Sequence, residues 1–160
     1  MSVEKVKKYL AQYGKDSAVT EFSVSSATVA LAAEALGVSP SRIAKTISFT
    51  NGSGGCTLIV AAGDAKIDNS KYKAHFGIKA TMLTPEEALQ LTGHAVGGVC
   101  PFAIENPDVA VYIDLSLKRF DTVYPAAGSS NSAVELTCEE LFTISRSREW
   151  VDVCKGWQEG

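Results

Sequence analysis

The sequence lacks any apolar run of the roughly 20 residues that a membrane-spanning helix requires. Residues 1–8 mix charged and apolar side chains, as an amphipathic helix does, and contain no apolar stretch typical of a secretory signal peptide. The four cysteines are scattered and form no Cys-x-x-Cys pair, so neither a zinc-binding nor a redox motif is present. These absences predict a cytoplasmic protein with reduced thiols, no membrane partner, no bound metal and no other cofactor.

An excess of positive charge is also missing, because 15 basic residues stand against 18 acidic ones and the net charge is -3. This balance argues against binding along a nucleic-acid backbone regardless of its sequence, so we expect no DNA partner. A protein with this charge balance can still contact one short end of an RNA. The basic residues between 66 and 79 are either a solvent-exposed face or a contact for RNA phosphates.

Length and composition predict a single domain covering residues 1–160. With 46% hydrophobic and 21% charged residues, a chain of 160 residues can bury one substantial core but hardly two. Strand patterns occur in pairs and do not alternate strictly with helices. This predicts an α/β fold of the α+β type, with a mixed, largely antiparallel sheet and helices packed around it. We expect strands at residues 45–49, 57–62, 109–114, 122–126 and 133–136, helices at 3–13, 28–36, 68–77, 84–93 and after 137, and a loosely ordered end from residue 155.

Lys45 is unusual for its position in a predicted strand. Residues two apart in a strand share a face, so Lys45 should point the same way as Ile47 and Phe49. Either the lysine lies at the end of the strand, with its stem packed and its ammonium in water, or it faces a pocket. The strand pattern leaves both interpretations open.

The segment 97–101, Gly-Gly-Val-Cys-Pro, is the second unusual feature. Adjacent glycines allow the backbone to approach another molecule closely and to present amide N–H groups to an oxyanion, although they are also common in ordinary turns. Cys100 would be a nucleophile only with a lowered thiol pKa and a base such as His75 or His94 nearby. A structural role for Cys100 is the simpler interpretation.

Several segments, taken in order, carry a resemblance to a known family. They are residues 41–49, 60–64, 67–68, 83–89, 91–93, 96–102, 111–114 and 124–128. Together they span about residues 20 to 145 and resemble the family of YbaK and the deacylases associated with prolyl-tRNA synthetase. An ordered set of this kind is much more specific than any of its single motifs.

The resemblance implies a compact editing domain that hydrolyses the ester between a wrong amino acid and the terminal adenosine of a tRNA. A substrate such as cysteinyl- or alanyl-tRNA specific for proline, edited in trans, would fit it, with an aminoacyl-tRNA synthetase as a possible partner. The attacking group would be water or the substrate's own side chain, so a Ser/His/Asp set is not required. The alternative is a noncatalytic module of the same fold that binds tRNA or an aminoacyl group, or regulates another protein.

The same resemblance implies the site residues. Lys45 matches the family's functional lysine, which would position the substrate electrostatically. Residues 97–101 match a Gly-x-x-x-Pro loop whose amides, near Gly98, would stabilise the developing oxyanion. After Gly128 this chain has Ser-Ser-Asn-Ser where family members often have a basic residue and a glycine, so the identity of the edited amino acid stays open. The expected catalytic residues are Lys45 and Gly98, and the expected substrate-binding residues are Gly97, Val99, Cys100, Pro101, Gly128 and Ser129.

Overall fold

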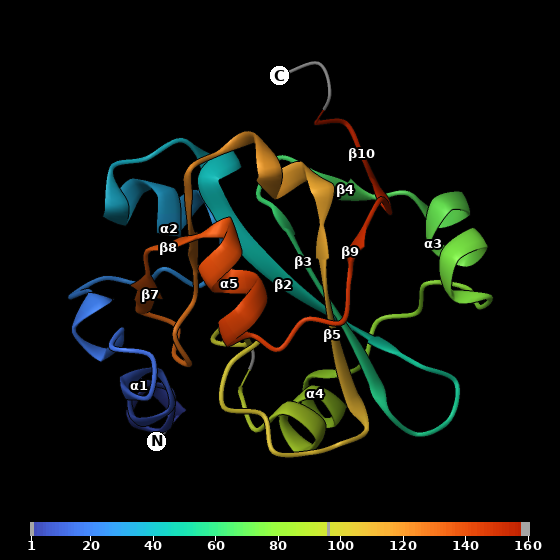
Figure 1. The fold of residues 1–160 in the computed structure, drawn as a ribbon, viewed down its shortest axis with the longest axis horizontal. Helices are drawn as coiled ribbons and strands as arrows, with labels where there is room; N and C mark the ends of the chain where they lie inside the picture. The colour runs from blue at the N-terminus through green and yellow to red at the C-terminus, as the bar shows by residue number, and fades with distance from the viewer. Residues whose placement is uncertain (1, 96, 158–160) are drawn as a thin grey trace.

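The computed structural model describes residues 2–95 and 97–157, and its largest element is a six-stranded sheet with strand order β8-β6-β2-β3-β5-β9 (Figure 1). Val96, which belongs to the motif at 96–102, and both ends of the expected domain, Met1 and residues 158–160, lie outside the described residues. The six strands are β2 (Ile43–Thr50), β3 (Cys56–Ala62), β5 (Val109–Asp114), β6 (Thr122–Pro125), β8 (Leu136–Thr137) and β9 (Trp150–Val151). Two small sheets pair β1 (Val19–Glu21) with β7 (Ser132–Val134) and β4 (Lys66–Ile67) with β10 (Cys154–Lys155).

The sheet is mixed, as expected. Among the described residues, four of the seven strand pairs are antiparallel, but three of the five pairs within the six-stranded sheet are parallel. Antiparallel pairs are therefore in the majority only when the two small sheets are counted together with the six-stranded sheet. The parallel pairs arise because long connections that carry helices return the chain to the sheet, as between β3 and β5. Every residue of β3 is buried, because this strand lies at the centre of the sheet with both faces covered.

The helices begin where local capping signals predict them. Thr84 and Thr137 form capping boxes with Glu87 and Glu140, and the Asp68 carboxylate accepts two backbone N–H groups at the start of its helix. In Figure 1, α3 lies on the opposite side of the molecule from α1 and α2. The helices are α1 (Ser2–Ala11), α2 (Val29–Leu36), α3 (Asn69–Phe76), α4 (Pro85–Thr92) and α5 (Cys138–Ile144), so the domain has the expected α/β class.

One edge of β2 is only partly covered. β6 pairs with β2 only at Ile43 and Ala44. At the other end of β2, the Thr50 N–H donates to Thr81 and the Leu83 N–H donates to Ser48. Between these contacts, residues 45–47 have no strand partner at this edge within the part of the chain that the structure describes. A gap in the sheet edge therefore opens at Lys45 and its neighbours.

The expectation of a loosely ordered end from residue 155 is wrong for Lys155 to Trp157. Lys155 pairs with Lys66 in the small sheet, and the Trp157 carbonyl accepts a hydrogen bond of 3.2 Å from Arg119. Local composition did not show these contacts, because both partners lie far away in the sequence.

None of the helices formed by residues 2–95 and 97–157 has the length and apolarity of a membrane span.

Candidate active site

A cavity of about 350 Å³ lies at the gap in the edge of β2. Its walls come from β2, from the segment before and within α2, from the start of α4, from the loop at 97–99 and from β6 and β7. Among the described residues that line it, Lys45 carries the only charged side chain. The polar lining consists otherwise of hydroxyl groups, from Ser26, Thr28, Thr46, Ser48, Tyr124 and Ser132, and the apolar lining is rich in alanine: Ala27, Ala32, Ala44, Ala88, Ala126 and Ala133.

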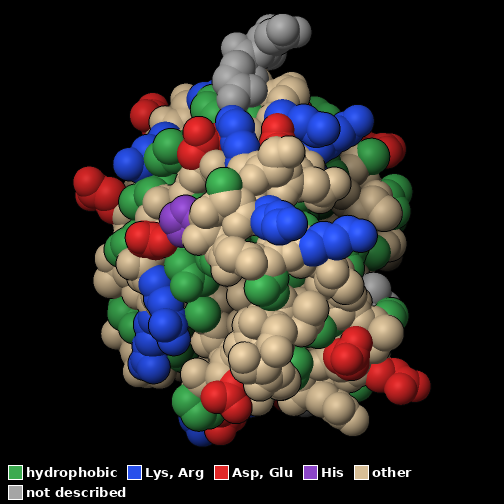
Figure 2. Space-filling model, turned by 90° about the vertical axis from the view of Figure 1, so that its right-hand side faces the viewer, with side chains coloured by type: hydrophobic (Ala, Val, Ile, Leu, Met, Phe, Trp, Pro, Cys, Tyr) green, Lys and Arg blue, Asp and Glu red, His purple; other side chains and the backbone are tan. Residues whose placement is uncertain are grey.

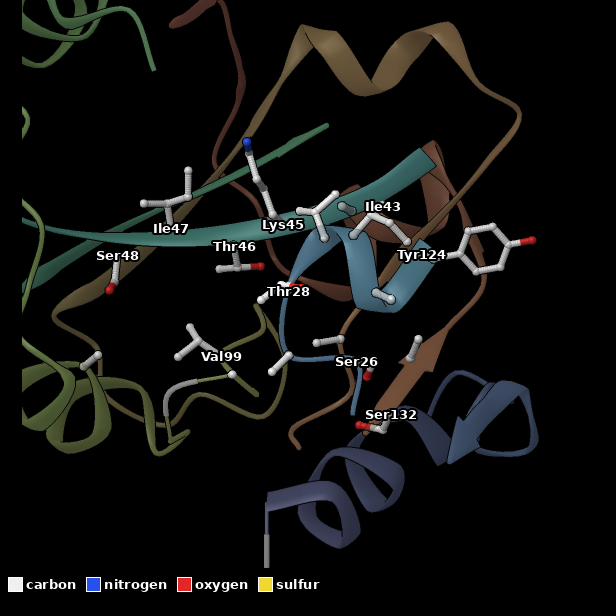
Figure 3. A pocket seen from close by; sticks show the side chains of 18 of the residues that line it. Ser26, Thr28, Ile43, Lys45, Thr46, Ile47, Ser48, Val99, Tyr124 and Ser132 are labelled. Atoms are coloured by element: carbon white, nitrogen blue, oxygen red, sulfur yellow. The ribbon is translucent and has the colours of Figure 1, made fainter. Parts of the chain in front are cut away.

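The Lys45 side chain does not point at the loop of residues 97–101. Figure 3 shows Lys45 and Ile47 on one side of β2 and Thr46 and Ser48 on the other, where Val99 also lies. This follows from the alternation of side chains along a strand. Lys45 lines the cavity, but its ammonium donates to the carbonyl oxygens of Gly63, at 3.4 Å, and of Ala65.

The electrostatic surroundings of Lys45 act in opposite directions. Burial disfavours the charged form and lowers the pKa of Lys45, while Cys154 and Asp64 partly offset this shift and Lys66 adds to it. The lysine is thus neither in open water at the end of its strand nor aimed into the loop. It occupies the wall of a cavity, with two of its three N–H donors bonded to the protein.

The structure brings the segment at 97–98 against the segment at 128–130. A Cβ atom on Gly98 would lie 2.8 Å from Ser129 Cα and N and 2.9 Å from the Gly128 carbonyl carbon, so only glycine fits there. Gly97, whose φ of +87° also favours glycine, packs against Ala27 and Ser130. Gly97 and Ala27 line the cavity, whereas Gly98, Gly128 and Ser129 do not.

The Gly98 amide is engaged in a turn. Its N–H donates to the Ala95 carbonyl at 3.0 Å, so in this conformation it is not free to bind an oxyanion. In this structure Gly98 has a structural role, because its lack of a side chain lets two loops pack closely. Its expected catalytic role stays a prediction. Val99, the next residue, does line the cavity.

Cys100 is fully buried and lies outside the lining of this cavity. Its Sγ atom lies 3.5 Å from His94 Nε2, which in turn lies 2.7 Å from the Phe102 carbonyl. Burial raises the pKa of the Cys100 thiol to about 12 and lowers the pKa of His94. Since the thiol is protonated at neutral pH and inaccessible, the geometry disfavours Cys100 as a nucleophile. Pro101 lines a different cavity, which it shares with Tyr9 and Arg146.

Thr46 is a site residue that the sequence patterns did not reveal. Its Oγ1 atom is buried and has no hydrogen-bond partner among the described residues, although the residue lines the cavity. Alternation predicts that Thr46 faces away from Lys45, but it does not show that this face borders a cavity. Ser26 also lines the cavity. Its N–H and its hydroxyl both bond the Ser130 carbonyl, at 2.6 and 3.3 Å, which ties the segment before α2 to the segment after β6.

In the described part of the chain, no three His, Cys, Asp or Glu side chains gather as metal ligands would. The cavity offers hydroxyl groups, backbone edges and one ammonium. This set suits a small polar organic group, which hydrogen bonds can hold within an otherwise apolar cavity.

Comparisons with known proteins identify the family of the chain. A family model described as an aminoacyl-tRNA editing domain matches residues 24–144. YwhH of Bacillus subtilis (strain 168), described as an uncharacterized protein, is 56% identical over 158 residues, covering 99% of this chain and 100% of that protein. The multifunctional Ser/Thr-tRNA deacylase ProXp-y of Escherichia coli (strain K12) is 30% identical over 98 residues, covering 60% of this chain and 58% of that protein. A crystal structure described as a candidate trans-editing enzyme for prolyl-tRNA synthetase has a TM-score of 0.86 and 29% identity, covering 97% of this chain and 98% of that one.

The matched region contains Lys45, the loop at 97–101 and the segments that line the cavity. The resemblance noted in the sequence is thereby confirmed. The chain belongs to the aminoacyl-tRNA editing domain family, whose members are deacylases, hydrolases that act on the ester bond of aminoacyl-tRNA.

Proposed function

We propose that this chain removes a small amino acid from a mischarged tRNA in trans, with the aminoacyl group bound in the cavity at the edge of β2. The observation that carries the proposal is the position of this cavity, which lies beside Lys45 and the loop at 97–99 and has no other charged side chain among its described lining residues. A cationic residue in the wall of an otherwise uncharged cavity suits a substrate whose anionic RNA end stays outside while its small acyl group enters.

The open edge of β2 supplies backbone donors and acceptors for the ester. Alternate residues of a strand direct their N–H and C=O groups to the same edge. Since Ser48 and Thr50 bond residues 81–83 at this edge, Thr46 directs its own N–H and C=O there as well. In the proposed complex, the amides of Thr46, Gly97 and Val99 polarise the ester carbonyl and stabilise the oxyanion, while Gly98 keeps the loop packed.

Hydrolysis in this site needs no protein nucleophile. A water molecule, or a group on the substrate itself, attacks the carbonyl that the backbone amides polarise. Lys45 binds the anionic 3′ end of the tRNA electrostatically and holds the ester at the edge of β2. Gly128 and Ser129 support the loop through their contact with Gly98, while Cys100 and Pro101 lie outside the lining.

The cavity limits which amino acids can be edited. A volume of about 350 Å³ lies at the low end of ligand cavities, and its alanine-rich wall suits a short side chain. We therefore propose cysteine or alanine attached to a proline tRNA as the first substrates to test. The hydroxyl groups in the lining make serine and threonine the next candidates, which the name of the E. coli relative also suggests.

Delivery of the tRNA is proposed to involve a synthetase. Figure 2 shows that the face carrying α3 mixes Lys and Arg side chains with Asp and Glu and forms no continuous basic surface. On this side of the molecule, Lys71 is paired with Asp152 and His75 with Glu149. With a net charge of -3, the chain gains little from nonspecific attraction to RNA. A function in translation further implies a cytoplasmic location.

A panel of mischarged tRNAs tests this function. It would include alanyl-, cysteinyl-, seryl- and threonyl-tRNA specific for proline, incubated with the wild type, Lys45→Ala and the control Lys15→Gln. The control removes a cation from an ion pair that does not line the cavity. We expect the wild type and the control to release one or two of the amino acids and Lys45→Ala to be impaired. If a folded wild type bound tRNA but released no amino acid, the noncatalytic module would be the better proposal, and the engaged Gly98 amide would then be its structural explanation.

A further inference from the structure

The turn between β3 and β4 holds the Lys45 ammonium. Gly63 and Ala65, whose carbonyls accept from Lys45, are the two neighbours of Asp64. An ammonium has three N–H donors, so these two bonds leave one for a substrate group and fix its direction. Any movement of this turn would therefore change where the third N–H points.

An ion pair fixes the position of that turn. Arg119, at the end of the 3-10 helix η3 (Leu115–Arg119), donates to Asp64 through both terminal nitrogens, at 2.6 and 2.9 Å. Such two-point pairs set geometry as well as charge. The same guanidinium donates to the carbonyls of Ser116 and Trp157 at 2.8 and 3.2 Å and lies over the Trp157 ring, so its own orientation is set from several sides.

We propose that Arg119 and Asp64 are positioning residues for Lys45, because their ion pair holds the turn whose two carbonyls orient the ammonium. Neither residue lines the cavity, so neither touches the substrate directly. The consequence for catalysis rests on the proposed function, whereas the consequence for Lys45 itself does not. Further support comes from Gly63, where a Cβ would lie 2.1 Å from the Pro40 carbonyl oxygen, which shows how closely this turn is packed.

The two partners should act on Lys45 with opposite sign. Asp64, in the turn, and Cys154, in β10, favour the charged lysine, while Lys66, in β4, disfavours it. Replacing Asp64 by asparagine removes an anion, so the pKa of Lys45 should fall. Replacing Arg119 by glutamine removes the cation that offsets Asp64, so the pKa of Lys45 should rise. These opposite shifts report the two charges, and a loss of activity in both variants reports the loss of positioning.

The experiment compares Asp64→Asn, Arg119→Gln and the control Lys15→Gln in the full chain. Lys15 is a useful control because its ion pair with Glu140 is about as exposed as that of Arg119 with Asp64 and lies outside the cavity. The first measurement is the titration of the Lys45 side chain by NMR, with its signal assigned from Lys45→Arg. The second is kcat/KM for deacylation as a function of pH.

We expect opposite shifts of the Lys45 pKa in Asp64→Asn and Arg119→Gln, and a fall in kcat/KM of ~10- to ~100-fold in both, as misplacement of a site group can cause. The alkaline limb of the pH profile should move down in Asp64→Asn and up in Arg119→Gln. An unchanged Lys45 titration in both folded variants would overturn the proposal, as would activity equal to that of Lys15→Gln. If the wild type deacylated no tRNA, the proposed function would fail, and the positioning would be decided by whether NMR relaxation shows a more mobile Lys45 side chain in both variants than in Lys15→Gln.

Discussion

Thr46 and Lys45 are adjacent in the sequence, yet their side chains lie on opposite faces of β2 and both residues line the same cavity (Figure 3). The Lys45 ammonium is bonded to the turn after β3, whereas Thr46 Oγ1 is buried and unpaired within the described structure. This relationship is possible because β2 has an uncovered edge at residues 45–47. In the proposed complex, a substrate at that edge would have the Lys45 side of β2 on one side and the Thr46 side on the other.

Replacing Thr46 by valine should lower the activity without lowering the stability of the protein. A buried hydroxyl without a partner costs ~1–3 kcal/mol, so Thr46→Val should leave the free energy of unfolding unchanged or raise it. If the hydroxyl binds the substrate, kcat/KM should fall by ~3- to ~10-fold, which corresponds to one hydrogen bond. Urea unfolding and deacylation assays measure the two effects.

Thr92→Val is the matched control. Thr92 is also buried, but its hydroxyl donates to the Ala88 carbonyl at 2.7 Å and accepts from the His94 N–H at 3.1 Å. Its loss should therefore lower the free energy of unfolding. A clear loss of stability in Thr46→Val would show that this hydroxyl has a partner of its own, contrary to the interpretation given above.

Gly98→Ala should both destabilise the protein and abolish activity. The added Cβ would lie 2.8 Å from the Ser129 backbone, which cannot move as a flexible side chain would. Overpacking of this kind costs ~1–3 kcal/mol and would push the loop at 97–99, which lines the cavity, away from the segment at 128–130. Thermal unfolding and deacylation assays measure the outcome. Gly14→Ala, where no atom lies within 4 Å of the new Cβ, should keep its activity although the φ of +71° lowers its stability. Full activity of Gly98→Ala would refute the importance of this loop contact.

Cys100→Ala should retain deacylase activity. The thiol is fully buried and its pKa is raised to about 12, so it has almost no thiolate at neutral pH. We expect kcat close to that of the wild type, with a small loss of stability from the vacated volume. Slow modification of Cys100 in the folded protein, followed by mass spectrometry, provides an independent check. A large fall in kcat in a well-folded variant would restore the thiol mechanism.

His94 should make the protein less stable in mild acid. Burial lowers its pKa below the ordinary value of 6.5, so the unfolded chain binds a proton that the folded chain does not. The free energy of unfolding should therefore fall as the pH decreases from 6.5 toward the folded-state pKa, by at most ~1.4 kcal/mol per pH unit. Urea titrations at several pH values measure this slope.

His94→Gln should reduce the slope below pH 6.5, while His75→Gln provides the control. His75 is only partly buried and is paired with Glu149 at 2.7 Å on the surface. If the two variants gave identical slopes, burial of His94 would not be the cause of the acid sensitivity. The two variants should be compared by the slope of the free energy of unfolding against pH and not by its absolute value. The loss of the hydrogen bond between His94 and the Phe102 carbonyl changes the stability at every pH.

Much of the fold could be predicted because its signals are local. The capping boxes at Thr84 and Thr137 involve residues three positions apart, and the strands β2 and β3 follow from short apolar patterns. The order of the strands in the sheet could not be predicted in this way. Parallel pairing between β3 and β5 depends on how a connection of more than forty residues returns to the sheet, which no short pattern encodes.

The sequence by itself determined the five helices, the strands β2, β3, β5 and β6, the class of the fold, the family, and the segments that carry Lys45 and the glycine loop, whereas the short strands β1, β4, β9 and β10 were not predicted. Only the tertiary structure decided how these residues serve the site. It joined residues 97–98 to residues 128–130, buried Cys100 beside His94, tied Lys45 to the turn at Asp64, and left Thr46 at an open edge. The physical reason is distance along the chain: caps and alternation depend on neighbours a few residues apart, whereas burial and most of these contacts depend on segments that meet only when the sheet is assembled.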